Sequence, residues 1–363
     1  MNFGENAIEW LKSYLNNRTQ QVKFDDIISE TATVEAGVPQ GSILGPILFI
    51  AFTADLASFM SNCVIKAYAD DTQFLVTGDS MDELKAGLED VISKAQQWYT
   101  QNCLKINPSK TEVIIFGQKR NNREEVKIRI TEDNTTKYIT TKDRVKLLGV
   151  TMDDKLSWEH HISKLKGIVC RTTANLARTT SVIPLKHRRL LYDALVVPHL
   201  NYCDVVWDGM FEKHANTIQK AANFGARTLL GLKKHCSATK ALVKLEMIPQ
   251  TERRKVHLGV FMHKLKEEKG SAELVTTFRE RTQRSHHHNT RSTKRGDANV
   301  EAHSTSRYKR STMHRAFKVW NDIPITIRSI DDTRKFKKAF QKHLLLNFIN
   351  DNGVSDQPRH HSC

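Results

Sequence analysis

Two adjacent aspartates, Asp70 and Asp71, stand between two runs of strand-forming residues in the segment 64–76, VIKAYADDTQFLV. Neighbouring carboxylates repel each other, and a turn that holds them together commonly does so around a divalent cation. Mg²⁺ prefers hard oxygen ligands, and a pair of such ions stabilises the entering and leaving oxygens of an in-line phosphoryl transfer. The pair therefore predicts a metal site for nucleotidyl transfer, although isolated Asp-Asp pairs also occur in solvated turns.

The predicted hairpin limits how many carboxylate oxygens can reach one ion. Successive side chains of a strand point to opposite faces. We therefore expect at least one further carboxylate to come from elsewhere.

A second motif, GVPQGSILGP, occupies residues 37–46 and runs into an apolar, helix-like segment. Its glycines allow backbone to approach a ligand closely, and Gln40 and Ser42 add polar groups where a helix N-terminus could meet phosphates or bases. The alternative is a glycine-rich turn that only starts a helix.

These motifs belong to a series in fixed order along the chain. The series is GVPQGSILGPILF (37–49), AYADDTQFL (67–75), LKINPSKTEVIIFG (104–117) and VKLLGVTMDDKLSW (145–158). It resembles the palm of reverse transcriptases, in particular those of jockey-type and LINE-like non-LTR retrotransposons. Residues 177–207 and 317–340 look like the thumb and C-terminal segment of these elements, so the resemblance covers nearly the whole chain.

The resemblance implies a role for each matching residue of the hairpin. Asp70 would be the firm ligand of Mg²⁺, or of Mn²⁺, and Asp71 a looser partner near the primer end. Tyr68 and Ala69 would shape the turn beside the primer terminus. The implied partners are an RNA template, a DNA primer or target, and deoxynucleotides.

The other motifs receive binding and positioning roles by the same resemblance. Lys110 would approach the leaving pyrophosphate, the alternative being a surface lysine. The residues expected to line the template and nucleotide side of the pocket are Pro39, Gln40, Gly41 and Ser42. Those expected to position the primer are Leu147, Leu148 and Gly149, although core packing would also explain the two leucines.

The resemblance also implies a further catalytic aspartate on a strand upstream of the helix that begins near residue 5. We therefore expect an N-terminally truncated fragment that holds part of the site and is inactive alone. Asp25 and Asp26 are nearby, but they fall after the helix, at the wrong point in the order.

The charge is unevenly distributed. Residues 1–160 carry 18 basic and 23 acidic side chains, whereas residues 161–363 carry 38 and 17, a net charge of +21. Such asymmetry indicates a polyanion bound mainly by the second half, and a charged solvated surface is the alternative. The chain has 363 residues, 39% of them hydrophobic, which is enough for two or three domain-sized cores.

Six cysteines lie far apart without a Cys-x-x-Cys pair. This spacing indicates a reducing compartment, hence an intracellular protein of the nucleus or cytoplasm. The longest apolar run, residues 43–52, is shorter than the roughly 20 residues that span a bilayer, so no membrane association is expected.

The pattern of elements predicts an α+β fold, with helices packed on a small, largely antiparallel sheet and a helical domain after it. Ser80 and Glu83 form a capping box before a helix with apolar residues at helical spacing up to Trp98, and strand-like runs follow at 112–117, 127–130 and 145–150. The predicted organisation is a partial palm (1–157), a helical thumb-like domain (158–280), a basic flexible linker (281–316), a docking turn and helix (317–350) and a disordered tail (351–363).

Three functions are compatible with these features. The first is an RNA-directed DNA polymerase fragment with two-metal chemistry. The second is a non-catalytic retroelement remnant that binds nucleic acid through its basic half. The third, a metal-binding module using His235, Cys236 and His286 to His288, lacks ligand spacing.

Overall fold

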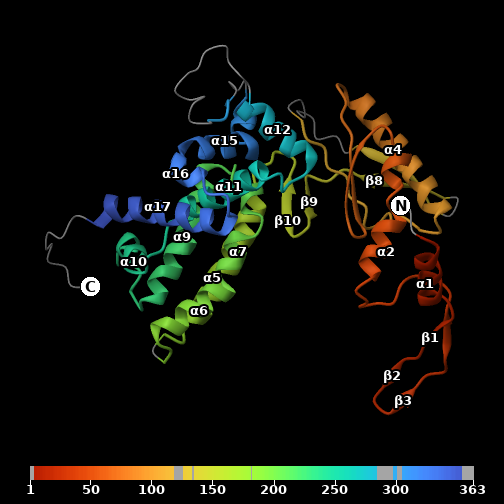
Figure 1. The fold of residues 1–363 in the computed structure, drawn as a ribbon, viewed down its shortest axis with the longest axis horizontal. Helices are drawn as coiled ribbons and strands as arrows, with labels where there is room; N and C mark the ends of the chain where they lie inside the picture. Colours follow the sequence, from red (N-terminus) through yellow and green to blue (C-terminus); the bar gives the residue numbers. More distant parts are fainter. Residues whose placement is uncertain are drawn as a thin grey trace. The chain divides into compact units, whose positions relative to one another are not determined.

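The computed structural model describes residues 4–117, 126–132, 135–180, 182–283, 297–300 and 305–353. The chain divides into two compact units, Met1–Ile115 with Lys119–Lys142, and Phe116–Gln118 with Asp143–Cys363. Figure 1 labels the helices and strands of both units.

The described part of the first unit combines helices with antiparallel hairpins, so it is α+β as expected. Its helices are α1 (Glu5–Leu15), α2 (Gly45–Phe52), α3 (Leu56–Phe59) and α4 (Met81–Gln101). Its strands pair as β1 (Arg18–Gln20) with β4 (Ala32–Val34), β2 (Lys23–Phe24) with β3 (Ile27–Ile28), β5 (Val64–Tyr68) with β6 (Asp71–Leu75), and β7 (Lys127–Glu132) with β8 (Thr135–Thr140).

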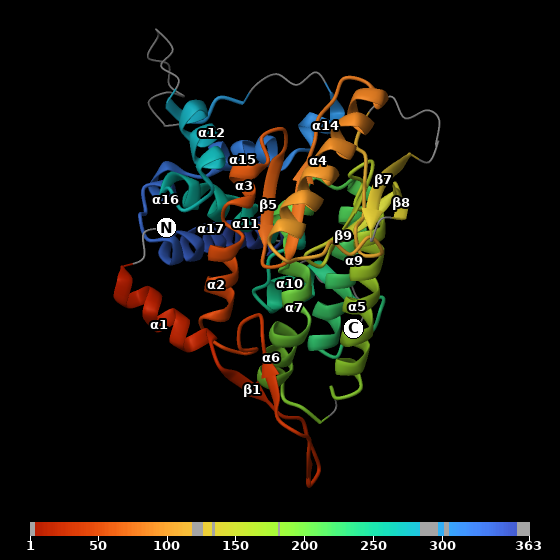
Figure 2. The same ribbon diagram turned by 90° about the vertical axis from the view of Figure 1, so that its right-hand side faces the viewer.

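Helix α4 is the element on which the first unit is built. Its N-terminus is capped as predicted, because the Ser80 hydroxyl accepts a hydrogen bond from the Glu83 backbone N–H at 3.1 Å. Val91, Ala95 and Trp98 recur on one face and are buried, as their spacing predicts. In Figure 2 hairpin β5–β6 lies beside α4, and its inner side chains pack on this core.

The prediction of a strand over residues 112–117 is wrong. Val113 and Ile115 alternate and are buried, but the backbone forms only an isolated bridge between Val113 and Thr141. Apolar alternation places side chains in a core without supplying a backbone partner. The expected small sheet is accordingly a set of separate two-stranded hairpins.

The first unit leaves many apolar side chains exposed. Helix α2 is apolar along its length, yet of its residues only Gly45 is buried. Ile43, Ile47 and Ile50 are 90%, 59% and 58% exposed, and the exposed large apolar residues on or beside hairpin β2–β3 are Val22, Phe24, Ile27 and Ile28. A helix that is apolar all round is normally covered by protein.

The second unit is mainly helical and begins with a hairpin, β9 (Arg144–Leu147) and β10 (Val150–Asp153). Its helices up to residue 244 are α5 (Glu159–Ala177), α6 (Leu185–Leu195), α7 (Val197–Asn201), α8 (Asp204–Trp207), α9 (Glu212–Leu229) and α10 (Ala238–Lys244). Those that follow are α11 (Gln250–Lys266), α12 (Ala272–Gln283), α14 (Ser306–Lys309), α15 (Thr312–Asp322), α16 (Ile325–Arg328) and α17 (Thr333–Gly353).

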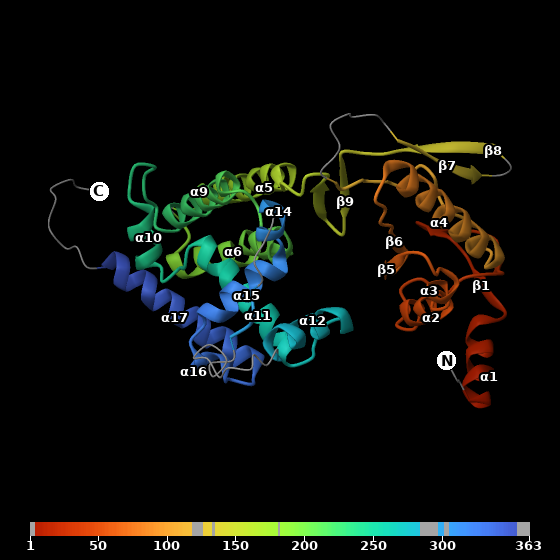
Figure 3. The same ribbon diagram turned by 90° about the horizontal axis from the view of Figure 1, so that it is seen from above.

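The second unit holds two hydrophobic clusters. In one, α5 packs along α9, with Tyr192 and Trp207 fully buried between the helices. In the other, α11 packs against α15 and α17, an arrangement that Figure 3 shows from above. Phe336 and Phe340 of α17 are buried there.

A buried ion-pair network joins three helices of the second unit. Asp208 accepts from Arg254 Nε at 2.7 Å and from Arg315 Nε at 2.6 Å, and the Asp208 and Arg254 side chains are only 3% and 4% exposed. Nearby, Asp204 and His257 Nδ1 are 2.5 Å apart. Burial raises the pKa of Asp204, against the opposing effect of the His257 hydrogen bond. Each charge therefore has a partner in the interior.

The predicted linker over 281–316 differs from the structure in its described part. Helix α12 extends to Gln283, and α15 begins at Thr312. Ala298 is buried, and its backbone N–H and carbonyl both bond the Asn321 side chain, at 2.8 and 2.9 Å. The low apolar content concealed these contacts, which come from a distant helix. Residues 284–296 and 301–304 lie outside the described residues, as does the predicted tail from 354 onward.

Within the described ranges, the structure contains no helix that is long and apolar enough to cross a membrane.

Candidate functional site

Asp70 and Asp71 lie at the tip of hairpin β5–β6. Tyr68 pairs with Asp71, so Ala69 and Asp70 form a two-residue turn, and Ala69 has a left-handed φ of 53°. Tyr68, Ala69 and both aspartates are solvent-exposed. The turn thus exposes both carboxylates to solvent, and their role as metal ligands stays a prediction.

The hairpin is attached to α4 by contacts on its inner side. Ile65 and Phe74 pack against the cluster formed by Leu56 and Trp98. The Tyr99 hydroxyl lies 3.3 Å from Thr72 Oγ1, one residue after Asp71. Sequence reasoning missed Tyr99, because its partner is 27 residues away and nothing in the spacing connects them.

The carboxylate oxygens at the tip of hairpin β5–β6 are of the type that binds a hard divalent cation. Two adjacent carboxylates supply the oxygen ligands that Mg²⁺ prefers. Within the described residues, no group of three or more His, Cys, Asp or Glu side chains could hold a metal ion. The metal role of Asp70 and Asp71 stays a prediction.

The loop before α2 owes its shape to two glycines. Gly37 and Gly41 have φ values of 86° and 79°, and a Cβ at either position would meet no atom within 4 Å. Backbone conformation, not crowding, therefore requires glycine there. Pro39 and Ser42 are half-buried, whereas Gln40 and Gly41 are exposed.

Ser42 has a local structural role in the same loop. Its hydroxyl accepts a hydrogen bond from the Gly45 N–H at 3.0 Å, at the start of α2. Arg18 Nη2 donates to the Gly37 carbonyl at 2.6 Å and ties the loop to β1. Gln40 and Gly41 thus remain the exposed members of the motif.

Lys110 lies in an exposed turn after Asn107. The Asn107 side chain accepts from the Ser109 N–H at 3.0 Å, and the Asn107 carbonyl accepts from the Lys110 N–H at 3.1 Å. Across the described ranges, no hydrogen bond or ion pair joins Lys110 to Asp70 or Asp71. Its proposed role in binding pyrophosphate stays a prediction.

Leu147, Leu148 and Gly149 form the tip of hairpin β9–β10 in the second unit. Leu148 and Gly149 have φ values of 44° and 85°, and Leu148 is strained there because a bulky side chain disfavours this region. The Tyr202 hydroxyl donates to the Leu148 carbonyl at 2.6 Å and stabilises the turn. Sequence reasoning missed Tyr202 as well, since 54 residues separate it from Leu148.

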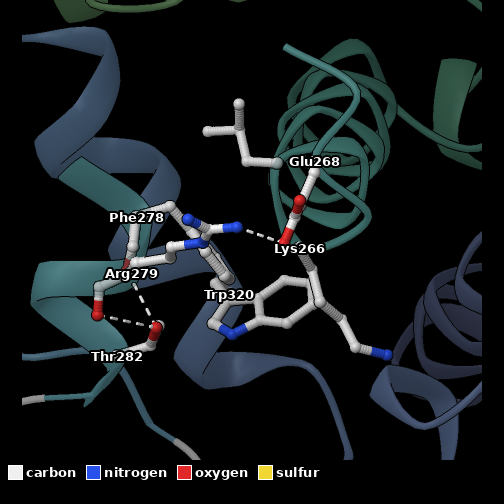
Figure 4. A pocket seen from close by; sticks show the side chains of 7 residues that line it. Lys266, Glu268, Phe278, Arg279, Thr282 and Trp320 are labelled. Carbon is white, nitrogen blue, oxygen red and sulfur yellow. Dashed lines mark hydrogen bonds and ion pairs between the residues drawn. The ribbon is translucent and has the colours of Figure 1, made fainter. Parts of the chain in front are cut away.

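A pocket of about 290 Å³ lies in the second unit between α11, α12 and α15. Figure 4 shows Phe278 and Trp320 in its wall and an ion pair between Arg279 and Glu268. None of the motif residues lines it. It is therefore separate from the site predicted by the sequence.

The family "Reverse transcriptase (RNA-dependent DNA polymerase)" matches residues 1–152. Residues 1–152 belong to the reverse transcriptase family. This reverse transcriptase segment contains every motif residue discussed above, from Pro39 to Gly149. The recognition made from four ordered motifs is thereby confirmed.

Curated relatives extend the likeness beyond the reverse transcriptase segment. The chain is 26% identical over 304 residues to the RNA-directed DNA polymerase from mobile element jockey of Drosophila melanogaster, covering 77% of the chain and 32% of that relative. It is 27% identical over 231 residues to the probable RNA-directed DNA polymerase from transposon X-element of the same species, covering 61% and 24%. The chain thus spans about a quarter to a third of these relatives, and no solved structure matches it.

Proposed function

We propose that this chain is a segment of a non-LTR retrotransposon polymerase that copies RNA into DNA. The observation that carries the proposal is the exposed Asp70-Asp71 turn inside a reverse transcriptase segment. The proposed substrates are a primed RNA template and deoxynucleotides. An intracellular location is a further proposal, supported by the free thiols of the five described cysteines.

In this proposal the aspartates hold Mg²⁺, or Mn²⁺, near the primer end. When bound, such an ion would offset the charge that develops on the reacting oxygens. Asp70 and Asp71 would contribute carboxylate oxygens, and the contact of Tyr99 with Thr72 would keep the hairpin tip at a fixed distance from α4. Gln40 and Gly41 would line the template side. Gly41 has only a hydrogen as its side chain and so leaves room for a base pair.

A further polypeptide segment is proposed to complete the site. Two observations support it. The two aspartates alone supply too few carboxylate oxygens for a pair of closely spaced Mg²⁺ ions. Helix α2, which directly follows the glycine loop, exposes Ile47 and Ile50 although it is apolar all round. A segment covering α2 could bring a third carboxylate to the hairpin.

Primer extension on a primed RNA template tests the proposal. The assay uses the chain alone and the chain joined to the residues that precede the matching stretch in the jockey polymerase. We expect incorporation of deoxynucleotides by the joined protein and none by the chain alone. Asp70→Asn in the joined protein should abolish incorporation, because the amide keeps the shape and loses the charge.

Asp79→Asn is the matched control, since Asp79 is an exposed aspartate in the same unit. It should leave incorporation unchanged. Template-dependent synthesis that survives Asp70→Asn would contradict the metal role of the hairpin. Asp70-dependent synthesis by residues 1–363 alone would contradict the need for a further segment, and Asp25 and Asp26 would be the next residues to replace.

The charge asymmetry supports a second candidate function, a remnant that binds nucleic acid without catalysis. The +21 charge of residues 161–363 does not depend on Asp70. Salt-dependent binding of nucleic acid together with an inactive joined protein would favour this candidate.

A further inference from the structure

The C-terminal helix α17 carries a one-sided group of cations. Arg334, Lys335, Lys338 and Lys342 are all exposed, Lys337 is exposed at the edge of this group, and residues 333–350 contain no aspartate or glutamate. We call the first four residues the outer face of α17.

Packing fixes the rotation of α17 and therefore the direction of this face. Phe336 is fully buried with its ring 4.4 Å from that of His263, and Phe340 packs where α11 has Gly259. At about 100° per residue, the outer face is centred roughly opposite these two phenylalanines. Figures 1 and 3 show α17 beside α11 and α16, two of the helices that it contacts.

The cations of the outer face lack partners in ion pairs among the residues that the structure describes. Asp331 lies 3.5 Å from Lys266 of α11, and Asp332 accepts the Lys335 backbone N–H at 2.7 Å. Arg334, Lys338 and Lys342 follow one another at four-residue spacing, where like charges destabilise a helix by a few tenths of a kcal/mol per pair. An external anion would remove this repulsion.

We propose that the outer face of α17 binds the phosphodiester backbone of a nucleic acid. Arg334 and Lys342 are separated by about 12 Å along the helix axis. Duplex DNA carries one negative charge per ~1.7 Å of its axis, so this length meets several phosphates. The choice of ligand rests on the proposed function, whereas the location rests on the packing of α17 alone.

The same cations could meet an anionic membrane, but the structure favours nucleic acid. A helix that lies on a bilayer inserts a free apolar face between the lipids. The apolar face of α17 is already covered, because Phe336 and Phe340 are buried in the second unit. The exposed side chains of residues 334–342 are mainly charged, and such a surface is suited to binding solvated phosphate groups.

Fluorescence anisotropy with the full chain and a labelled RNA–DNA hybrid tests the proposal. The triple variant Arg334→Gln, Lys338→Gln, Lys342→Gln keeps good helix formers and removes three charges. We expect its slope of log affinity against log salt to be less steep by about 2 to 3, and its affinity to be at least tenfold weaker at about 100 mM salt.

The matched control removes three exposed lysines on three other helices of the unit, by Lys166→Gln in α5, Lys220→Gln in α9 and Lys318→Gln in α15. Its affinity should change less than about threefold. A further variant, Lys338→Arg with Lys342→Arg, should bind like the wild type, which separates loss of charge from loss of fold.

Three results would overturn the proposal. Equal losses in the triple variant and the control would show that total charge, and no particular face, binds the hybrid. Loss of binding to phosphatidylserine vesicles with unchanged hybrid binding would assign the face to membranes. No binding of the hybrid by the wild-type chain at about 50 mM salt would refute the proposed function together with this inference.

Discussion

The two units of the chain bury their apolar residues to different degrees. In the second unit, Trp207, Tyr192 and Phe336 are fully buried, and the interior charge of Asp208 is paired with two arginines. In the first unit, α2 and hairpin β2–β3 expose large apolar side chains that a water-soluble fold normally covers. The second unit is thus organised around its own cores.

This difference separates the two functions proposed for the chain, metal binding at the hairpin and nucleic-acid binding at α17. The hairpin with Asp70 and Asp71 belongs to the first unit, and the outer face of α17 belongs to the second unit, which holds two large hydrophobic clusters. The proposed binding of nucleic acid by the second unit can therefore be tested apart from the catalytic chemistry proposed for the first.

Replacing Asp208 should have the largest effect on stability. Asp208→Ala leaves Arg254 buried without its anion, and breaking such a pair costs about 3 to 5 kcal/mol. Amide hydrogen exchange in α8, α11 and α15 should accelerate accordingly. Asp90→Ala is the control from the first unit, because the Asp90–Lys94 pair is exposed and contributes about 0.3 to 0.5 kcal/mol. Equal losses of stability in Asp208→Ala and Asp90→Ala would contradict the difference in burial between the two units.

Crowding at Gly259 should have the next largest effect. A Cβ at this position would lie 2.8 Å from the Phe340 ring and 3.0 Å from Ile323 Cδ1, so Gly259→Ala should cost about 1 to 3 kcal/mol and loosen α17. Urea denaturation measures the cost. At Gly167 of α5 a Cβ would meet only Arg171 Nη1 at 3.5 Å, so Gly167→Ala should stabilise the unit by about 0.5 to 1 kcal/mol.

Acidification should weaken the second unit through its buried histidines. Burial, with a smaller effect of Lys164, lowers the pKa of His161, and burial also lowers the pKa of His214. The unfolded chain then binds more protons than the folded one below about pH 6.5, so the free energy of unfolding falls as the pH falls through that window.

The variant His161→Asn isolates one of these contributions. Asn can still accept the hydrogen bond that His161 Nδ1 receives from the Thr151 N–H. Urea denaturation at several pH values between 7.5 and 5.5 should give a shallower loss of stability for the variant than for the wild type. Parallel curves would show that His161 does not carry a depressed pKa.

The smallest effect is expected at Ile47. This side chain is 59% exposed, so Ile47→Ser should change the stability of the chain by less than about 0.5 kcal/mol. The same substitution in the protein extended upstream should cost more if a further segment covers α2. An equal and small effect in both proteins would contradict the proposed covering of α2.

Much of the local structure could be predicted from the sequence because its causes are local. The Ser80 cap and the apolar spacing up to Trp98 define α4, and the hairpin around Asp70 follows from its strand-forming flanks. Family resemblance added the order of the motifs, and the match to residues 1–152 agrees with it.

The interactions that were missed are non-local. Asp208 pairs with Arg254 and Arg315, which lie 46 and 107 residues away, and Asn321 holds Ala298 across 23 residues. No spacing rule connects such residues. The residues 112–117 show the converse, since an apolar alternation suggested a strand whose backbone finds a partner only at Val113.

Metal rescue is the most direct test of the claim that Asp70 binds the catalytic ion. In the protein extended upstream, Asp70→Cys replaces a hard oxygen ligand by a soft thiolate. We predict that primer extension with Mg²⁺ falls at least about 100-fold, the upper range for disturbing the surroundings of a metal ligand. We further predict that a thiophilic ion such as Cd²⁺ restores synthesis in Asp70→Cys but not in Asp70→Asn. Full synthesis by Asp70→Cys with Mg²⁺, or no rescue by Cd²⁺ in a correctly folded variant, would contradict the account.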